Sequence, residues 1–455
     1  MKIYIVLMLG LKLILSVSSI LAQEYSWLDA VQIGSEYTEH NIGSSLAVDK
    51  EGNQYLTGEF FSEMKLGSFI LRSTFGDMFV AKRDPKGVWL WAVSAVSKES
   101  SWGEGIAVDD SGNVYVTGNF RNTVSFGEYV LNAYNTNTFN VFITKLNPNG
   151  KFIWARVGSG EGFDSGSGIA LDTKGNVYVT GKFEETISFG NTLLVSQGDT
   201  DGFVTKLDSL GNYLWAKSFG GAGVYDLGED ICLDKDNNIC LIGRFSDSVN
   251  FDKIKLISKG SYDIFSAKLD SEGNFVWAVS AGGDGPDYCK GIALDDSCNL
   301  YLCGSFFGNA SFGNHKLKSN EELHVYIAKL DTTGQFLWAK SSIGTGYNEA
   351  SSIAIDKKCN LYVCGRFIKQ VSFGSSKLND GSIFVCKLND NGDILWAKQG
   401  GGNTRDECTD IGLDLSGNVY LLGNFESIAK FGNETLGKDW LFGNSIFLAK
   451  LSPHN

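Results

Sequence analysis

The chain has 455 residues, a formal net charge of −13 and 20% charged residues. It holds 55 glycines but only 4 prolines, which suits many tight turns better than a disordered Pro- and Gly-rich tract. An acidic chain without a Lys/Arg cluster is a poor partner for nucleic acid or for anionic membrane surfaces, so neither is expected.

The first 22 residues have the pattern of a secretory signal peptide. Lys2 gives a positive start, an apolar run follows, and residues 18–22 are small enough around Ala22 for cleavage. The run contains Lys12 and is short for a membrane span, which needs about 20 apolar residues, and no other stretch approaches that length. We therefore expect a signal peptide over 1–22, one domain over 23–455, and a monomer that is secreted, periplasmic or on the cell surface.

A repeat of about 62 residues fills the rest of the chain. Each copy carries a glycine at the end of a strand-like run: Gly58, Gly118, Gly181, Gly243, Gly304, Gly365 and Gly423. Six copies continue to a tryptophan in constant phase: Trp91, Trp154, Trp215, Trp277, Trp338 and Trp396. The seventh copy stops before its tryptophan, and residues 25–30, around Trp27, stand ahead of the first copy as the missing piece. This arrangement predicts a closed ring.

The third copy shows the plan of one unit. Strands are expected at 168–172, 177–183, 203–207 and 213–217, and residues 188–190 with Leu193 should connect the second to the third. Asp172 is placed to accept backbone hydrogen bonds in the first turn, where Gly175 is free to take positive φ. No window has a sustained 3.6-residue apolar period, and the strands are apolar on both faces. Seven such sheets packed radially make an all-β, seven-bladed β-propeller with four antiparallel strands per blade.

The split seventh unit should close the ring. We expect residues 25–31 to pair with 446–451 as the outermost strand of the last blade. Closing a flexible loop of this length costs about 5 kcal/mol. Burial of Trp27 contributes about 5 kcal/mol at most, and each ladder hydrogen bond adds about 1 kcal/mol, so closure is favoured.

The repeat resembles the seven-bladed β-propeller repeat (SBBP) family of exported bacterial proteins. The similarity is carried by residues 112–120, 125–127 and 214–217, with Gly220 and Gly221, and it extends over 25–451. The resemblance implies the propeller fold. It implies little about activity, because the family is defined by its scaffold.

A polar residue stands five positions before each innermost strand, and four of the seven are aspartates. The set is Asn41, Ser101, Asp164, Asp226, Asp287, Asn348 and Asp406. Carboxylates that converge on a channel mouth can bind a cation or accept hydrogen bonds from a sugar. The alternative is that each side chain caps the Gly-rich turn that leads into its strand.

The third strand of each copy carries a lysine: Lys82, Lys145, Lys206, Lys268, Lys329, Lys387 and Lys450. Each lysine precedes a turn that usually begins with Asp or Asn. We interpret the set as structural, through pairing within the blade or a buried stem with an exposed amine.

Three departures from the repeat are candidates for function. They are the polar insertion 132–140, Trp102 beside the axis, and the segment 438–443 with Trp440. Exposed aromatic residues on loops stack on sugars or anchor protein partners, although they also pack under their own loops.

The nine cysteines all lie between Cys232 and Cys408, and the odd number leaves at least one unpaired within the chain. We expect small buried thiols, with one or two disulfides as the alternative. The four histidines fall at unrelated phases, and no nucleophile or phosphate-loop motif is present, so no catalytic residue, metal or cofactor is predicted.

Three functions remain open from the sequence. The first is an exported, non-enzymatic binding or scaffold module that holds a protein or glycan partner through loops on one face, with Asp164, Asp226, Asp287, Asp406, Trp102 and Trp440 as candidate ligand-binding residues. The second is a polysaccharide hydrolase or lyase that uses the four aspartates as acid and base. The third is a purely structural envelope protein. An open pocket with paired carboxylates would favour the enzyme, whereas carboxylates tied to their own turns would favour binding or structure.

Overall fold

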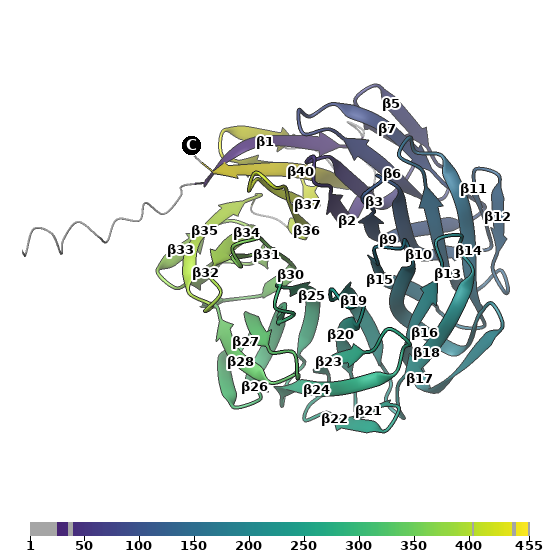
Figure 1. The fold of residues 1–455 in the computed structure, drawn as a ribbon. Helices are drawn as coiled ribbons and strands as arrows, with labels where there is room; N and C mark the ends of the chain where they lie inside the picture. Colours follow the sequence, from purple (N-terminus) through teal and green to yellow (C-terminus); the bar gives the residue numbers. More distant parts are fainter. Residues whose placement is uncertain (1–24, 35–39, 403–404, 439–442, 454–455) are drawn as a thin grey trace, which may run out of the picture.

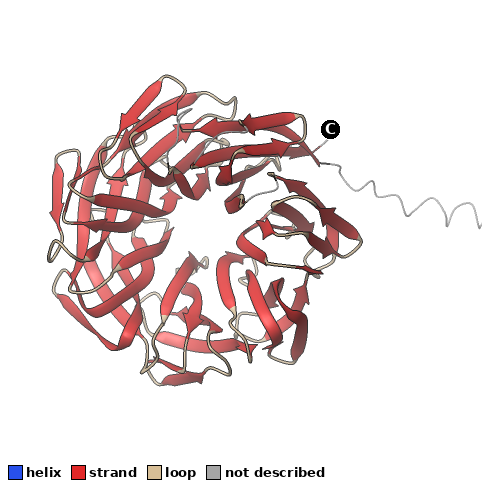
Figure 2. Ribbon diagram, turned by 180° about the vertical axis from the view of Figure 1, so that it is seen from behind, coloured by secondary structure: helices blue, strands red, loops and turns tan. Residues whose placement is uncertain are grey.

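The computed structural model describes residues 25–34, 40–402, 405–438 and 443–453, and every regular element in these ranges is a β-strand. The strands form seven antiparallel four-stranded blades around a central opening (Figure 1). Figure 2 shows the same ring from behind. The predicted all-β propeller is confirmed, and no helix of the described residues is long and apolar enough to cross a membrane.

The blades repeat one plan, in which the first strand lines the axis and the fourth lies outside. From the axis outward, the strands are β2 (Ile42–Val48), β3 (Gln54–Phe60), β6 (Asp77–Arg83) and β7 (Trp89–Ser94) in blade 1; β9 (Ser100–Val108), β10 (Val114–Arg121), β13 (Phe139–Leu146) and β14 (Phe152–Gly160) in blade 2; β15 (Ser165–Leu171), β16 (Val177–Phe189), β17 (Thr192–Leu207) and β18 (Tyr213–Phe219) in blade 3; β19 (Leu227–Leu233), β20 (Ile239–Phe245), β23 (Asp263–Leu269) and β24 (Phe275–Gly283) in blade 4; β25 (Tyr288–Leu294), β26 (Leu300–Phe312), β27 (His315–Leu330) and β28 (Phe336–Ser341) in blade 5; β30 (Asn348–Ile355), β31 (Leu361–Phe367), β34 (Ile383–Leu388) and β35 (Ile394–Gly400) in blade 6; and β36 (Glu407–Leu413), β37 (Val419–Glu426), β40 (Asn444–Pro453) and β1 (Tyr25–Ile33) in blade 7.

The connection between the second and third strands is itself a hairpin, which the sequence analysis took for a plain connection. In blade 3 it continues β16 and β17, where Ile187 and Phe189 are buried and Leu193 is exposed. Phe189 packs on Tyr213 of the fourth strand, with ring centroids 5.5 Å apart. The other short strands of this outer layer are β4 (Glu63–Leu66), β5 (Phe69–Arg72), β8 (Val96–Ser97), β11 (Thr123–Phe126), β12 (Tyr129–Asn132), β21 (Ser248–Phe251), β22 (Ile254–Ile257), β29 (Ile343–Thr345), β32 (Gln370–Phe373), β33 (Ser376–Asn379), β38 (Ile428–Phe431) and β39 (Glu434–Gly437).

Each blade buries both of its faces against its neighbours. Between blades 2 and 3, Tyr115 and Val141 from one side pack with Ile169 and Val179 from the other, and all four are buried. This packing explains why the strands are apolar on both faces, since a lone sheet would leave one face in water.

The N-terminal strand closes the ring as predicted. β1 pairs with β40 in antiparallel register from Tyr25 opposite Pro453 to Ile33 opposite Ile446. Tyr25 is 3% exposed and Ile33 is 1% exposed. The Tyr25 hydroxyl also shares a hydrogen bond of 2.9 Å with that of Tyr362 in blade 6. β1, here called the clasp, therefore pairs with the third strand of blade 7 and also contacts blade 6.

The predicted phase of Trp27 is wrong by two residues. In blades 1–6 the fourth-strand tryptophan lies opposite the repeat lysine, as Trp91 lies opposite Lys82. In blade 7 the residue opposite Lys450 is Asp29, and Trp27 lies two residues earlier. Trp27 is the counterpart of Trp89 in blade 1, because the pairs Trp89-Trp91 and Trp27-Asp29 occupy the same two positions.

Trp27 is half-buried rather than fully buried in this position. Its ring meets Phe431 edge-on, with centroids 5.0 Å apart, and its Nε1 donates to the carbonyl of Gln399 at 3.3 Å. The fully buried side chains of β1 are Tyr25 and Ile33, so these residues stabilise the clasp more than Trp27 does.

Asp29 replaces a tryptophan contact with an ion pair. Its Oδ2 lies 2.9 Å from Nη2 of Arg83 in blade 1, and Arg83 is buried. At five other blade boundaries the tryptophan rests on the turn glycine of the next blade, as Trp91 rests on Gly150. At the boundary between blades 7 and 1, an ion pair therefore adds to the buried apolar packing where five other boundaries have a tryptophan–glycine contact.

We expect Asp29→Ala to lower the free energy of unfolding by about 1–2 kcal/mol, because it leaves the Arg83 guanidinium buried without its carboxylate. The double variant Asp29→Trp/Arg83→Leu copies the other boundaries and should recover most of that loss. Urea denaturation of both variants measures the difference. Equal stability of Asp29→Ala and the wild-type protein would contradict the assigned role of the ion pair.

The first turn of each blade and the repeat lysine confirm two sequence predictions. Asp172 Oδ1 accepts the backbone N–H groups of Lys174 and Asn176, each at 2.9 Å, and Gly175 has a φ of 78°. The repeat lysine lies over a tyrosine of its own blade, with Lys206 Nζ 4.8 Å from the Tyr178 ring centroid. The same contact occurs at Lys82, Lys145, Lys329, Lys387 and Lys450. In blade 4 the tyrosine is replaced by Cys240, and Lys268 binds Asp234 directly at 2.8 Å.

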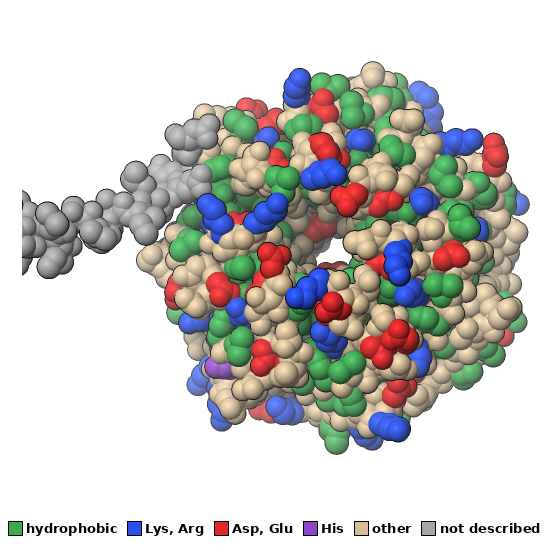
Figure 3. Space-filling model, viewed as in Figure 1, with side chains coloured by type: hydrophobic (Ala, Val, Ile, Leu, Met, Phe, Trp, Pro, Cys, Tyr) green, Lys and Arg blue, Asp and Glu red, His purple; other side chains and the backbone are tan. Residues whose placement is uncertain are grey.

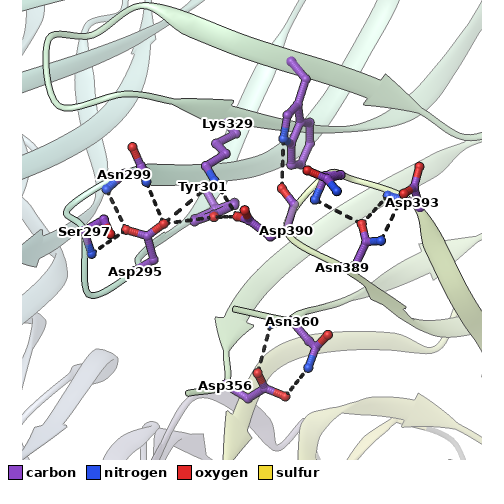
Figure 4. A network of polar contacts seen from close by, with 12 residues as sticks. Asp295, Ser297, Asn299, Tyr301, Lys329, Asp356, Asn360, Asn389, Asp390 and Asp393 are labelled. Carbon is purple, nitrogen blue, oxygen red and sulfur yellow. Dashed lines mark hydrogen bonds and ion pairs between the residues drawn. The ribbon is translucent and has the colours of Figure 1, made fainter. Parts of the chain in front are cut away.

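The lysines also tie neighbouring blades together. Figure 4 shows the boundary between blades 5 and 6, where Lys329 forms an ion pair with Asp390 of the next blade. The Tyr301 hydroxyl lies between the carboxylates of Asp390 and Asp295, and Trp338 Nε1 donates to the Asp390 carbonyl at 3.1 Å. The polar groups at this boundary therefore hold the ring together.

All nine cysteines are free thiols, seven of them buried and two, Cys232 and Cys359, half-buried. The prediction of small buried thiols is confirmed. Cys298 and Cys359 occupy turn positions with φ of 63° and 59°, where four other blades have glycine and blade 4 has Asn237.

Candidate functional site

The two faces of the ring differ in what they carry. One face, here called the turn face, holds the tight turns between first and second strands and between third and fourth strands. The opposite face, here called the loop face, gathers the starts of the first and third strands and the ends of the second and fourth. All described candidate residues from the sequence lie at the loop face.

The structure places the predicted polar ring inside the protein. Asp164, Asp226, Asp287 and Asp406 are at most 1% exposed. Each carboxylate accepts a backbone N–H twenty residues onward, where the second strand of its own blade ends; the donors are Glu184, Ser246, Phe307 and Glu426, at 3.3, 3.1, 3.3 and 3.0 Å. These contacts match the capping alternative, since each side chain ties two strand ends of one blade.

Five of the seven polar residues, Asn41, Ser101, Asp164, Asp226 and Asp287, also donate their backbone N–H to a carbonyl of the preceding blade. The backbone N–H of Asp226 donates to the Thr200 carbonyl at 3.0 Å, and that of Asp287 donates to the Tyr262 carbonyl at 2.9 Å. The next residue of the preceding blade is again an aspartate, Asp201 or Asp263. Two boundaries, 3/4 and 4/5, therefore bring together pairs of buried carboxylates.

The pairs are close and perturbed. Asp263 Oδ1 and Asp287 Oδ2 each lie 2.7 Å from the point where a Cβ on Gly282 would stand, so both oxygens face one small space. Burial raises the pKa of Asp287 to about 7, and the charge of Asp263 adds to the shift. At the other boundary, burial raises the pKa of Asp226 to about 7 and that of Asp201 to about 6. Two adjacent buried carboxylates resist simultaneous ionisation.

The other boundaries avoid such a pair. Asn140 stands where Asp201 and Asp263 do, so Asp164 faces an amide, although burial, with a smaller contribution from the charge of Glu184, raises the pKa of Asp164 to about 8. Asp406 Oδ2 accepts a hydrogen bond of 3.0 Å from the Ser382 hydroxyl. The prediction that the four aspartates bind a ligand requires them to be reached from solvent, and their burial gives no such access.

Aromatic rings and cations form a continuous surface on the loop face across blades 2–5. We call it the aromatic belt, and it consists of Trp102, Phe139, Phe163, Tyr225, Tyr262 and Tyr288, with Lys182 and Arg244 between the rings. All eight side chains are half-buried or exposed. Every member comes from a strand end or from the loop before a first or third strand, so the repeat itself brings them to one face.

The first half of the belt starts at Trp102. Its ring lies 5.7 Å from that of Phe139, which lies 4.4 Å from that of Phe163. Lys182 Nζ then lies 5.3 Å from the Phe163 centroid and 5.2 Å from that of Tyr225. The predicted site residue Trp102 thus belongs to a larger surface.

The second half of the belt surrounds Arg244. Its guanidinium carbon lies 5.2 Å from the ring centroids of both Tyr225 and Tyr288, and 6.0 Å from that of Tyr262. Cation–π contacts of this kind hold a guanidinium in place while its N–H groups remain available to an anion. Glu229 is its nearest carboxylate, at 3.6 Å from Nε.

Glu229, which lies 3.6 Å from Arg244, also lines a polar cavity of about 220 Å³ in the central opening. All seven first strands line it, and their side chains include Glu104, Glu229 and Lys290 with serine and threonine hydroxyls. Lys290 Nζ lies 3.2 Å from Glu229. Figure 3 shows acidic and basic side chains around the mouth of the opening.

Sequence reasoning found Trp102 but missed the rest of the belt. The missed signal was phase: Lys182 and Arg244 directly follow the repeat glycines, and Phe163 and Tyr225 directly precede the ring aspartates. Trp440, the second predicted aromatic anchor, lies outside the described residues, and so does the segment 439–442 around it.

Comparison with known proteins agrees with this architecture. Closed antiparallel blades around an axis define a β-propeller. The SBBP β-propeller repeat profile matches residues 97–119 and 154–182, so the resemblance is confirmed and the chain carries SBBP repeats.

An uncharacterized WD repeat-containing protein, L264 of Acanthamoeba polyphaga mimivirus, is 23% identical over 445 residues, which cover 78% of this chain and 32% of the viral protein. The chain thus spans about a third of that relative's length. Among solved structures, the Pan2 WD40 domain of Neurospora crassa aligns over 95% of this chain and 97% of its own, at 11% identity and a TM-score of 0.49. A protein of unknown function from Dyadobacter fermentans aligns over 79% and 96%, at 11% identity and a TM-score of 0.43. These likenesses say nothing about what this chain binds.

Proposed function

We propose that the protein is an exported, non-enzymatic binding module that holds a protein or glycan partner on its loop face. The observation that carries this proposal is the aromatic belt, which places half-exposed rings side by side over four blades. Binding surfaces draw most of their affinity from such aromatic and arginine side chains. Residues 1–22 support export, because they have the composition of a signal peptide.

The enzymatic alternative receives less support. A glycosidase needs two carboxylates that flank the scissile bond and can be reached by the sugar. Asp164, Asp226, Asp287 and Asp406 are buried and bound to backbone N–H groups, so none of them opens onto a substrate-sized space. A purely structural envelope role predicts a uniformly polar face, which differs from the belt.

The test compares two belt variants with a matched variant of the turn face. Trp102→Ala and Phe163→Ala remove aromatic rings from the belt. Leu210→Ala instead removes the side chain of a residue that is 69% exposed in a turn of blade 3. Glycan arrays and pull-downs with the mature chain should show binding that falls at least about tenfold in the belt variants and is unchanged in Leu210→Ala. Binding that survives both belt substitutions and is lost with Leu210→Ala would place the partner on the other face.

A further inference from the structure

Lys182 of the belt differs from the other cations of the loop face. Arg121 lies 3.0 Å from Glu99, and Lys290 lies 3.2 Å from Glu229. For Lys182, no carboxylate of the described chain lies within 4.0 Å of Nζ, which instead lies 3.2 Å from the Tyr225 hydroxyl. Lys182 therefore has charge to offer an anion.

Arg244 forms an ion pair with Glu229 but keeps one unused donor. Its Nε is buried and has no hydrogen-bond acceptor among the described residues, and the Glu229 carboxylate at 3.6 Å is too far for a hydrogen bond. A buried donor without an acceptor costs free energy, and a guanidinium is shaped to bind a carboxylate through two parallel hydrogen bonds. Lys182 and Arg244 both contact the Tyr225 ring, at 5.2 Å each, so two cations lie beside one aromatic ring.

On this basis we propose that the aromatic belt binds an anionic polysaccharide, with hexuronate carboxylates held by Arg244 and Lys182 and the sugar rings packed against Tyr225, Tyr262 and Tyr288. This inference rests on the proposed function, since it names the ligand class of the same surface.

Three features favour a glycan over an acidic peptide. The rings of Tyr225 and Tyr262 meet edge to face, with centroids 6.2 Å apart and an interplanar angle of 72°, and both are half-exposed, so they give successive sugars an aromatic surface to pack against. A protein anchor instead needs a desolvated apolar pocket that excludes water. The cations alternate with the rings, so a polymer with one carboxylate on each sugar matches them. The net charge of −13 makes general attraction of anions weak, and recognition must come from these residues.

The experiment uses three soluble polymers and measures their affinity for the mature chain. Polygalacturonate carries the carboxylates, its methyl ester has the same sugar backbone without them, and poly-L-glutamate has the charge without the sugar. We expect polygalacturonate to bind at least about tenfold more tightly than the other two, with an affinity that falls as salt rises.

The variants assign the binding to the belt. Lys182→Gln and Arg244→Gln should each reduce the preference for polygalacturonate by about tenfold, and Arg244→Lys should restore only part of it because the two parallel hydrogen bonds are lost. Lys235→Gln, an exposed turn-face lysine of blade 4, removes the same charge and should change nothing. Circular dichroism and melting temperature show that each variant is folded, and Lys182→Gln remains informative if Arg244→Gln does not fold.

Each other result has a definite meaning. Equal binding of polygalacturonate and its methyl ester, or equal binding of poly-L-glutamate, overturns the anionic-glycan inference. If none of the three polymers binds but a protein partner is lost in Trp102→Ala, the inference fails and the proposed function stands. If polygalacturonate binding is unchanged in both belt variants and is lost in Lys235→Gln, both fail.

Discussion

A chain that begins at residue 35, without β1, is expected to lose cooperative folding. Tyr25 and Ile33 are almost fully buried on β1, and truncating side chains of this size costs about 2–5 kcal/mol each. The eight residue pairs with β40 would be lost as well, leaving the edge of β40 unpaired. Because a domain's whole stability is about 5–15 kcal/mol, this loss is comparable to the total.

Urea denaturation followed by tryptophan fluorescence measures the effect, and a circular permutant provides the control. Tyr25 and Pro453 are opposite each other in the register, so a short linker can join the two ends. The permutant opens instead between Asn135 and Thr136, which are exposed in the loop before β13. It keeps every strand and should remain within about 2 kcal/mol of the wild-type protein, as changes at exposed loops usually do. An identical midpoint for the truncated and full chains would contradict the clasp.

The architecture could be predicted from the sequence because the same strand and turn pattern occurs in seven copies. A glycine, an aspartate turn and a strand pattern recur at nearly constant spacing, and in each copy the same local chemistry predicts the same strands. The split seventh unit, with residues 25–31 far from 446–451 in sequence, predicted the closure itself.

The repeat pattern did not predict the register between β1 and β40. Blade 1 has tryptophan at both Trp89 and Trp91, and Trp27 fits either position by composition. The observed register pairs the Asp29 carboxylate with Arg83 of the next blade and buries Tyr25 and Ile33. These contacts join segments that are distant in sequence, so no local pattern predicts them.

The candidate site was harder to predict for a related reason. The four aspartates were noticed because they recur at the same position of the repeat. At that position, however, their side chains cap strand ends of their own blades. The belt residues differ from blade to blade, since Lys182 and Arg244 correspond to Asn119 in blade 2 and Ser305 in blade 5. On a repeat scaffold, functional residues occupy positions that differ between copies. A single sequence does not show which of these variable positions matter for function.

The paired carboxylates predict that the protein is more stable in mild acid than in mild base. In the folded protein, burial and the neighbouring charge raise the pKa of Asp287 to about 7 and that of Asp226 to about 7, whereas an unfolded aspartate titrates near 3.9. Between these values the folded state holds protons that the unfolded state has lost. The free energy of unfolding therefore falls as pH rises from about 4 to about 7, by about 1.4 kcal/mol for each unit of raised pKa.

Asp201→Asn together with Asp263→Asn should remove part of this penalty. Each substitution gives its boundary the Asn–Asp pair that Asn140 and Asp164 already form in the same molecule, so the fold can accept it. At pH 8 the double variant should exceed the wild-type protein by about 1–3 kcal/mol in urea denaturation, because one of two facing charges is gone at each boundary. At pH 5 the gain should largely disappear, since one partner of each wild-type pair is then protonated.

Asp77→Asn is the matched control for the pH effect. Asp77 occupies the same position in blade 1 and is also buried, but Ser101 takes the place of the second aspartate. Its Oδ1 accepts the Ser97 backbone N–H at 2.7 Å, as the carboxylates of Asp201 and Asp263 accept those of Gln197 and Lys259 at 3.0 Å. Because no aspartate of the next blade faces Asp77, its substitution should give a smaller gain at pH 8 than the double variant. A wild-type stability that rises from pH 5 to pH 8, or a double variant that gains as much at pH 5 as at pH 8, would show that the carboxylate pairs do not share a proton. Lys259, whose charge lowers the pKa of both Asp263 and Asp287, makes the effect smaller at boundary 4/5 than at boundary 3/4, and the two single variants should rank in that order.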